Sequence, residues 1–287
     1  MSPAAENERA RIDGRTRLLA LVGSPVAHSL SPRLHNHALA ALDQNYVYVA
    51  LDAREEDLAN LLDVFPRVGG AGWNVTTPHK PAVGRLVRAG DPEVLMTGIV
   101  NTVTFRDQPI GHCTDGRGFR SWMKARGIEP GGGGIFLLGF GSLGTSLAYQ
   151  LGLEFPLTIV SRDPAEAESV LLAWYDKGWS GTPVRCVGWI DPLPKRPILA
   201  VGCLPVDAGR SREVATWLSG VDPASIVVDT NYGPGRTPLA AQARDRGLTV
   251  FDGRGLLCHQ AALSLSLWLD RPVPVSLLEE ALPEDSL

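Results

Sequence analysis

Short apolar runs alternate with helix-like segments along the whole chain. In the first half, the apolar runs LLALV at 18–22, YVYVAL and GWNVTT at 72–77 are separated by the helical patterns SPRLHNHALAALD and EEDLANLLDVF. Strand-sized runs that alternate with helices are typical of β-α-β units, whose strands form a largely parallel sheet. The first half of the chain is therefore predicted to be an α/β domain.

The same alternation restarts after the glycine-rich segment IEPGGGG. Such a run does not hold regular structure, so residues 127–134 are a first candidate for the domain boundary. Beyond it the strand-sized runs are IFLLG, LTIVS, RCVGW, PILAVG, SIVVDT and LTVFD, with helical patterns near 143–152 and 164–178. This order predicts a second, doubly wound parallel sheet, followed by a last helical stretch at 256–268.

Composition narrows the class of protein and its partners. The 287 residues are 44% hydrophobic and 20% charged, as in an ordinary soluble globular protein. A net charge of -4 does not attract a polyanion, so neither nucleic acid nor an anionic membrane is expected as a partner. The apolar runs are too short to span a membrane, residues 1–17 lack the core of a signal peptide, and the four cysteines are scattered. We therefore expect a cytoplasmic protein that binds a small molecule, as a monomer or a homodimer.

A glycine-rich turn follows the predicted strand IFLLG and opens the next helix. Its residues complete the pattern G-x-G-x-x-G and are Gly139, Phe140, Gly141, Ser142, Leu143 and Gly144. Glycine allows the tight turn, the close approach of a pyrophosphate and the close packing of helix on strand, while the helix N-terminus supplies unpaired N–H groups. In this setting the pattern favours a dinucleotide site over a purely structural turn.

The next strand bears on which dinucleotide binds. It ends with Ser161, Arg162 and Asp163, where an NAD site usually places a carboxylate for the ribose 2′-hydroxyl. Arg162 favours a 2′-phosphate instead, whereas Asp163 and the nearby Glu166 weaken that argument. NADP is therefore preferred as the cofactor, and NAD stays open.

Two serines lie in the segment GSPVAHSLSP, which joins the first strand to the first helix. Ser31 and Pro32 are predicted to be the N-cap and the first residue of that helix, so its positive end would lie at the carboxyl edge of the sheet. A carboxylate would be stabilised there, and the hydroxyls of Ser29 and Ser31 can donate hydrogen bonds to it. Capping alone also explains Ser31, so both interpretations stay open at this point.

Lys80 ends the segment NVTTPHK, where a strand stops and a proline again starts a turn or helix. The helix dipole disfavours a lysine in a first turn, so its presence there needs an explanation. A positive helix end and partial desolvation favour the neutral amine, which suits a proton donor or acceptor, and an ordinary surface lysine is the alternative. Further polar residues gather at predicted strand ends, namely Asn101, Thr102, Thr114 and Asp115.

Together these motifs resemble the shikimate dehydrogenase family. The resemblance is carried by GSPVAHSLSP, NVTTPHK, GIVNTV, CTDGRGF, the G-x-G-x-x-G turn, NYGPGRTPL and DGRGLLCHQAA, in this order over residues 18–268. It implies an oxidoreductase of aromatic amino acid biosynthesis that reversibly reduces 3-dehydroshikimate with NADPH, with hydride delivered to the C3 carbonyl. It also implies a substrate domain at 1–115, to which helices in 253–287 return, and a Rossmann-type nucleotide-binding domain at 116–252.

The resemblance implies a role for each matching residue. Lys80 and Asp115 would be the catalytic pair, because an ammonium donates a proton and neutralises an alkoxide, while a neighbouring carboxylate fixes its geometry and favours its charged form. Ser29 and Ser31 would bind the substrate carboxylate. Its ring hydroxyls would be bound by Asn74, Thr76, Asn101 and Gln260, with Tyr232 near substrate and nicotinamide. The cofactor would be bound by Gly139, Gly141, Ser142, Leu143, Gly144, Ser161, Arg162 and Gly253.

Three departures from the family pattern keep alternatives open. Cys203–Asp207 (CLPVD) stands where members usually carry Asn-x-Thr or Asn-x-Ser, Cys113 stands where Asn is usual, and the residues at 161–163 replace Asn-Arg-Thr. One alternative is a paralogue that acts on quinate or another shikimate analogue, with NAD as a second cofactor option. Another is a non-catalytic ligand sensor, which the intact Lys80 and Asp115 argue against.

The histidines do not point to a metal. His35 and His37 lie two residues apart on a predicted helix, about 200° around its axis, so they do not face one ion and no metal is expected. His79 and His112 flank catalytic candidates, and hydrogen-bonded neighbours are the simpler interpretation.

Overall fold

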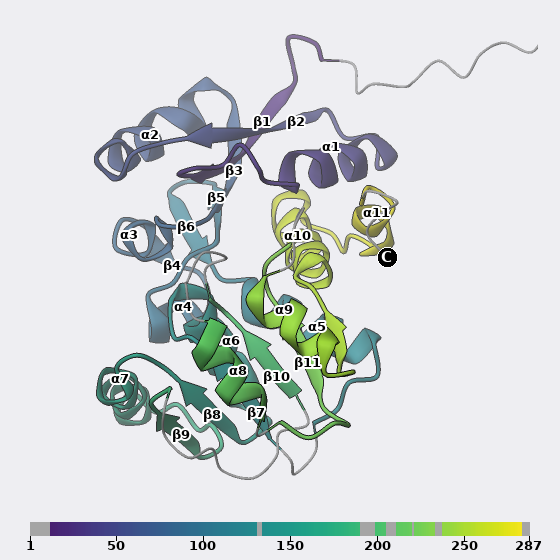
Figure 1. The fold of residues 1–287 in the computed structure, drawn as a ribbon. Coiled ribbons are helices and arrows are strands. Elements are labelled where there is room, and N and C mark those ends of the chain that lie inside the picture. Colours follow the sequence, from purple (N-terminus) through teal and green to yellow (C-terminus); the bar gives the residue numbers. More distant parts are fainter. Residues whose placement is uncertain are drawn as a thin grey trace, which may run out of the picture. The chain divides into compact units, whose positions relative to one another are not determined.

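The structure is a computed structural model that describes residues 12–130, 134–189, 199–204, 211–219, 221–232 and 237–282. The chain divides into two compact units, which are drawn in Figure 1. Unit 1 holds the described residues up to Val94, Gly98–Thr114 and the chain from Cys258 onward. Unit 2 holds Leu95–Thr97 and Asp115–Leu257. The functional domains expected at 1–115 with 253–287, and at 116–252, stay a prediction.

The sheet of unit 1 has the strand order β2-β1-β3-β5-β6-β4. Its strands are β1 (Arg17–Gly23), β2 (Tyr46–Asp52), β3 (Gly70–Val75), β4 (Arg88–Ala89), β5 (Thr102–Phe105) and β6 (Pro109–His112). β1 is parallel to β2 and β3, and β4 is parallel to β6. β5 departs from the predicted parallel arrangement, because it is antiparallel to both β3 and β6. Only residues 106–108 join β5 to β6, and such a short loop permits a hairpin but no parallel crossover.

The helices of this part of the chain are α1 (Ser31–Ala41), η1 (Glu55–Asp57), α2 (Leu58–Val64), η2 (Phe65–Val68), α3 (Lys80–Gly84), α4 (Pro92–Thr97), α10 (Arg254–Leu269) and α11 (Ser276–Glu279). Residues of α2, η2, α3 and α4 contribute to the core of the sheet, and α11 packs on α1. The end of α4 and the first turn of α10 belong to unit 2. The fully buried Trp73 of β3 meets Phe105 edge to face at 5.3 Å, with Phe65 beside both rings. Trp268 of α10 donates a hydrogen bond to the Val103 carbonyl at 3.0 Å, which ties that helix to β5. The terminal part of the chain is thereby fixed to the first sheet.

Unit 2 has a sheet with the order β12-β11-β10-β7-β8-β9, in which every pairing is parallel. Its strands are β7 (Ile135–Leu138), β8 (Leu157–Val160), β9 (Val184–Val187), β10 (Leu199–Gly202), β11 (Ile226–Asp229) and β12 (Thr249–Phe251). Its other helices are α5 (Asp115–Ala125), α6 (Ser142–Leu151), α7 (Pro164–Asp176), α8 (Ser211–Ser219) and α9 (Pro238–Asp245). This strand order is that of a dinucleotide-binding sheet and confirms the predicted Rossmann-type fold.

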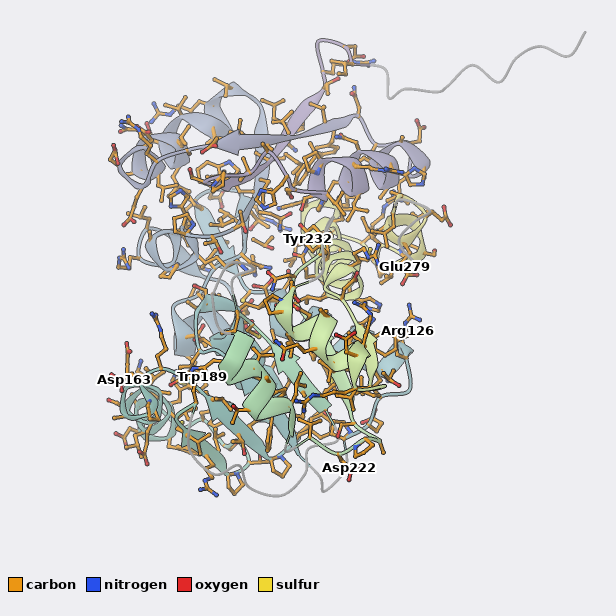
Figure 2. The ribbon with its side chains drawn as sticks, in the orientation of Figure 1. Arg126, Asp163, Trp189, Asp222, Tyr232 and Glu279 are labelled. Carbon is orange, nitrogen blue, oxygen red and sulfur yellow. The ribbon has the colours of Figure 1, made fainter. Side chains whose placement is uncertain are left out.

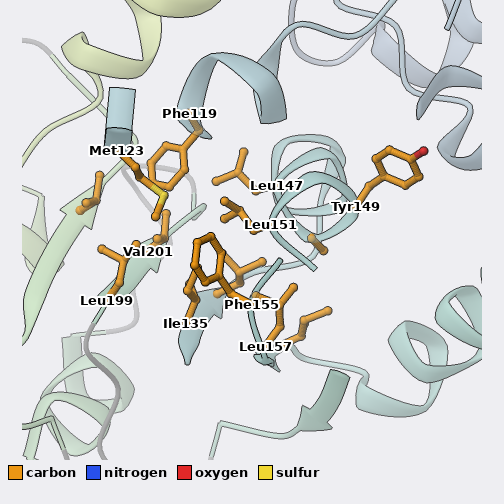
Figure 3. Packing of buried hydrophobic residues seen from close by; sticks show 14 of the residues in the cluster. Phe119, Met123, Ile135, Leu147, Tyr149, Leu151, Phe155, Leu157, Leu199 and Val201 are labelled. Carbon is orange, nitrogen blue, oxygen red and sulfur yellow. The ribbon is translucent and has the colours of Figure 1, made fainter. Parts of the chain in front are cut away.

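The packing of the core shows that unit 2 begins earlier in the chain than the glycine-rich segment at 127–134. Phe119 and Met123 of α5 pack with Leu147 and Leu151 of α6 over the strands of the sheet (Figure 3). α5 therefore belongs to this unit, and the candidate boundary at 127–134 is wrong. No helix within the described ranges is both long enough and apolar enough to cross a membrane.

Candidate active site

The two predicted carboxylate-binding serines lie at the start of α1. Ser29 is half-buried, and its Oγ accepts a hydrogen bond from the backbone N–H of Ser31 at 3.2 Å. Ser31 is the first residue of α1 and is 5% exposed, while Leu30 occupies the cap position. The predicted cap is therefore wrong by one residue, because the Ser29 hydroxyl already binds the N–H group that begins the helix. Both serines still flank its positive end.

A buried polar cluster lies in unit 1 beside β3, β5 and α10. Its members, called the polar cluster below, are Asn74, Asn101, Thr102, Thr114, Gln260 and Ser264, all at least nine-tenths buried. Asn101 is at its centre. Its Oδ1 accepts hydrogen bonds from the Thr114 N–H at 2.8 Å and from the Thr102 hydroxyl at 2.9 Å. Its Nδ2 donates to the Thr114 Oγ1 at 2.9 Å and to the Gln260 Oε1 at 3.3 Å.

Asn74 is the second centre of the polar cluster. Its Nδ2 lies 3.0 Å from the Ser264 Oγ and 3.1 Å from the Asn101 carbonyl, and its Oδ1 accepts from the Tyr48 hydroxyl at 2.8 Å. The structure thus brings together three residues predicted separately, Asn74, Asn101 and Gln260. Amides and hydroxyls that both donate and accept can bind the hydroxyl groups of a polyol.

Two members of this network were missed by sequence reasoning. Ser264 lies four residues after Gln260, so both face the same side of α10, and this spacing was the available signal. Tyr48 lies on β2 and stacks on His35 of α1, with the ring centroids 4.0 Å apart. Nothing in the local pattern of β2 separates Tyr48 from an ordinary core tyrosine, because its hydroxyl contact is made across the sheet.

Thr76 and Lys80 follow β3 in a tight turn. The Thr76 N–H donates to the Val22 carbonyl at 2.9 Å, and a Cβ on Gly23 would lie 2.3 Å from the Thr76 methyl, so a side chain there would displace Thr76. Lys80 is half-buried and lies in the first turn of α3, as predicted, where it is the first helical residue. Its carbonyl accepts from the Val100 N–H at 3.3 Å. His79 is buried, with its Nε2 2.7 Å from the Ala53 carbonyl, which fixes the residue before Lys80.

Asp115, the other predicted catalytic residue, begins α5 in unit 2. It is 5% exposed, and the next N–H, of Gly116, donates to the Ser146 Oγ at 3.0 Å. Lys80 belongs to unit 1, so each residue is placed within its own unit. The pairing of Lys80 with Asp115 stays a prediction.

The three glycines of the motif in unit 2 each have a distinct structural reason. Gly139 has a φ of 99°, which disfavours any side chain. A Cβ on Gly144 would lie 2.2 Å from the Gly139 carbonyl oxygen, so α6 could not pack so closely on the turn. Gly141 precedes α6, and a Cβ there would meet nothing within 4 Å. The turn therefore leaves open space at the helix N-terminus, where a pyrophosphate is predicted to bind.

The end of β8 carries the residues predicted to select the cofactor. Asp163, labelled in Figure 2, is the N-cap of α7 and accepts a hydrogen bond from the Glu166 N–H at 2.9 Å. Its carboxylate is thus engaged by the helix. Arg162 is exposed, whereas the Ser161 Oγ is buried and has no hydrogen-bond partner in the part of the chain that the structure describes. Asp163 was one of two carboxylates that argued against a 2′-phosphate beside Arg162. Its role as a helix cap accounts for its presence there and weakens that argument.

Tyr232 and Gly253 lie near the carboxyl ends of the strands of unit 2. Tyr232, labelled in Figure 2, follows Asn231, whose side chain donates to the Leu204 carbonyl at 2.7 Å. The Gly253 N–H donates to the Asn231 carbonyl at 3.1 Å, and a Cβ on Gly253 would lie 2.0 Å from the Thr230 carbonyl oxygen. Of the departure at 203–207, only Cys203 and Leu204 lie among the described residues.

Burial shifts the pKa of three groups. It lowers the pKa of His35 to about 4, so this ring is neutral at physiological pH. Burial also raises the pKa of the Cys203 thiol to about 12, with the Asp229 carboxylate acting in the same direction, so the thiol stays protonated. The pKa of Asp229 itself is raised by burial, although hydrogen bonds from Asn231 oppose the shift.

Comparison with known proteins places this arrangement in a family. Residues 21–103 match the family described as the shikimate dehydrogenase substrate binding domain. A shikimate dehydrogenase (NADP(+)) of Geobacter metallireducens is 34% identical over 93% of this chain and 96% of its own length. The chain belongs to the shikimate dehydrogenase family. The resemblance found in the motifs is thereby confirmed.

Solved structures of this family agree in fold over nearly the whole chain. The enzyme of Thermus thermophilus, solved with NADP(H) and shikimate, is 30% identical with a TM-score of 0.78, over 93% of this chain and 98% of that one. The enzyme of Listeria monocytogenes, solved with shikimate and NAD, is 27% identical with a TM-score of 0.80, over 94% and 97%. Both cofactors therefore occur in relatives of this shikimate dehydrogenase-family chain.

Proposed function

We propose that this chain reversibly reduces 3-dehydroshikimate to shikimate with NADPH. The observation that carries the proposal is the buried polar cluster of unit 1, in which Asn74, Asn101 and Gln260 converge. It lies in a chain whose relatives are named for shikimate and NADP(+). In this proposal unit 1 corresponds to the substrate domain and unit 2 to the nucleotide domain.

The substrate is proposed to bind in unit 1 through both ends. Ser29 and Ser31 would hold its carboxylate at the positive end of α1, where two hydroxyls and the helix N-terminus favour an anion. The side-chain amides of Asn74, Asn101 and Gln260 and the hydroxyl of Thr76 would bind the ring hydroxyls. Tyr232, which belongs to unit 2, is also proposed to contact the substrate.

The residues of unit 2 fit a dinucleotide. The open space at Gly141 leaves room for a pyrophosphate, and the Ser161 hydroxyl, which has no hydrogen-bond partner among the described residues, offers a hydrogen bond beside Arg162. We propose that NADP is bound by this set, which comprises Gly139, Gly141, Ser142, Leu143, Gly144, Ser161, Arg162 and Gly253. Bound NADPH would supply the hydride.

The chain's own chemistry is proton transfer. We propose that Lys80 donates a proton to the oxygen at C3 as it becomes an alcohol, and that the Lys80 charge stabilises the developing alkoxide. Asp115 is proposed to fix the Lys80 amine and to favour its charged form. In the reverse direction Lys80 takes the proton back, so the same two residues serve both directions.

The test is the rate of reduced nicotinamide formation by the purified protein. Shikimate and quinate are each assayed with NADP and with NAD. The proposal predicts that shikimate with NADP gives the dominant kcat/KM. A dominant rate with quinate or with NAD would overturn the substrate or cofactor assignment, and no rate in any combination would overturn the proposed reaction.

A further inference from the structure

Asp91 joins two segments of unit 1 through one carboxylate. The side chain is 13% exposed and belongs to the residue before α4. Its Oδ1 accepts the Val94 N–H at 2.9 Å, which caps that helix. Its Oδ2 accepts the Cys113 N–H at 3.1 Å, although Cys113 lies 22 residues further along the chain. Capping therefore accounts for only one of the two oxygens.

The Cys113 N–H belongs to a segment that Asn101 holds from its other side. The Asn101 N–H donates to the His112 carbonyl at 3.0 Å, and the Asn101 Oδ1 accepts the Thr114 N–H at 2.8 Å. Asn101 thus contacts the residues before and after Cys113, while Asp91 binds Cys113 itself. In an extended segment, successive N–H groups point in opposite directions. Residues 112–114 are therefore clamped between Asn101 and Asp91.

The clamp is charged and shielded from solvent. A carboxylate that accepts a backbone N–H makes a stronger hydrogen bond than a neutral acceptor does. His112 lies against the same carboxylate, with its Nδ1 3.7 Å from the Asp91 Oδ2 and its Nε2 3.4 Å from the Thr104 Oγ1. The segment that carries Thr114 into the polar cluster is thus fixed by Asp91, outside the cluster, as well as by Asn101 within it.

We propose that Asp91 is a positioning residue for the substrate site. By holding Cys113 it fixes the Thr114 N–H and hydroxyl against Asn101, and it thereby sets the direction in which the Asn101 amide faces a ring hydroxyl. This inference rests on the proposed function, in which Asn101 binds substrate. In this proposal Asp91 acts through Cys113 and Thr114 and not through a contact with the substrate.

Two substitutions test the clamp, and the first of them also separates the clamp from the cap. Asp91→Ser keeps an oxygen that can cap α4 but has no second oxygen for Cys113. Asp91→Asn keeps the shape and one oxygen, and places an NH2 group against one of the two N–H donors. We expect both variants to raise the KM for shikimate about tenfold, with the KM for NADP unchanged. Asp63→Ser, which removes a solvent-exposed carboxylate paired with Arg67, is the control and keeps wild-type values.

A second measurement does not depend on turnover. Amide hydrogen exchange at Thr114, followed by NMR in the full-length protein, is expected to be faster in Asp91→Ser than in the wild type and in Asp63→Ser. Unchanged exchange at Thr114, or an unchanged KM for shikimate in both Asp91 variants, would overturn the role of Asp91. An equal rise in the KM for NADP together with a lower Tm would also overturn this role, because it would indicate that the whole fold is destabilised. A wild-type protein inactive with shikimate would instead overturn the proposed function, and the exchange result would still decide whether the clamp exists.

Discussion

The polar cluster of unit 1 and the glycine turn of unit 2 are built by opposite means. In the cluster, side chains fill the space, and the two amides of Asn74 and Asn101 are engaged by neighbouring polar groups. In the turn, glycines leave out side chains. At Gly144 this lets the helix approach the Gly139 carbonyl, and at Gly141 it leaves open space. Substitutions that remove polar atoms should therefore impair the cluster, whereas substitutions that add atoms at the glycines should impair the turn.

The largest expected effect comes from removing the Lys80 amine. Lys80→Ala should lower kcat about 1000-fold, because the proton donor and the charge that stabilises the alkoxide are both lost. Shikimate binding should change little, since the serines and amides remain. Steady-state kinetics and calorimetric titration with shikimate measure the two quantities, with Lys124→Ala on the exposed side of α5 as the control. Equal kcat in Lys80→Ala and wild type would contradict the catalytic role.

Lowering the pH should reduce the free energy of unfolding through the buried His35. Its pKa is about 4 in the folded protein and 6.5 in an exposed imidazole, so the unfolded chain binds more protons between these values. The free energy of unfolding should therefore fall as the pH drops from about 6.5 to about 4, by about 3 kcal/mol in all.

Urea unfolding at several pH values measures this loss. His35→Phe keeps a ring that can stack on Tyr48 and should remove most of the pH dependence in this range. His37→Phe replaces an exposed histidine of the same helix and should keep it. An identical pH dependence in wild type and His35→Phe would show that His35 is not the cause.

The architecture of both units was predictable from hydrophobic alternation, but the antiparallel β5 was not. Alternation predicts strands and helices, and it does not reveal that β5 and β6 form a hairpin. Glycine content placed the boundary too late, because the burial of Phe119 and Met123 against α6 decides where α5 belongs. That packing is visible only in three dimensions.

Candidate residues could be named from the sequence where they lie at strand ends or in a local motif, and their roles in binding and catalysis stay a prediction. Ser29, Asn74, Lys80 and the glycines belong to such motifs, so the sequence indicated them. Tyr48 and Ser264 reach the polar cluster across the sheet and from a distant helix, through contacts with Asn74. The contact of Tyr48 has no local sequence signal, because it is made across the sheet. For Ser264 the only local signal is its spacing of four residues from Gln260 on the same helix.

A smaller effect should separate the two glycines of the turn. Gly144→Ala should lower the free energy of unfolding by about 2 kcal/mol, because its Cβ would overlap the Gly139 carbonyl. Gly141→Ala should leave stability unchanged, because its Cβ meets open space. Thermal unfolding of both variants tests this difference, and equal loss of stability would mean that the turn is not packed as described.

The smallest effect concerns the choice of cofactor. Arg162→Leu should raise the KM for NADPH about tenfold more than the KM for NADH, because a charge-assisted contact to the 2′-phosphate is lost. Lys177→Leu removes an exposed cation at the other end of α7 and should leave the ratio alone. A ratio unchanged in Arg162→Leu would remove the argument for NADP from this residue.

The most direct test of the division between the two units is a crossed titration. The affinities of wild type, Ser29→Ala and Gly141→Ala for shikimate and for NADP are measured by calorimetry. Ser29→Ala should weaken shikimate about tenfold and leave NADP unchanged, and Gly141→Ala should weaken NADP about tenfold and leave shikimate unchanged. Loss of both affinities in either variant, or of neither in both, would contradict the assignment of substrate to unit 1 and cofactor to unit 2.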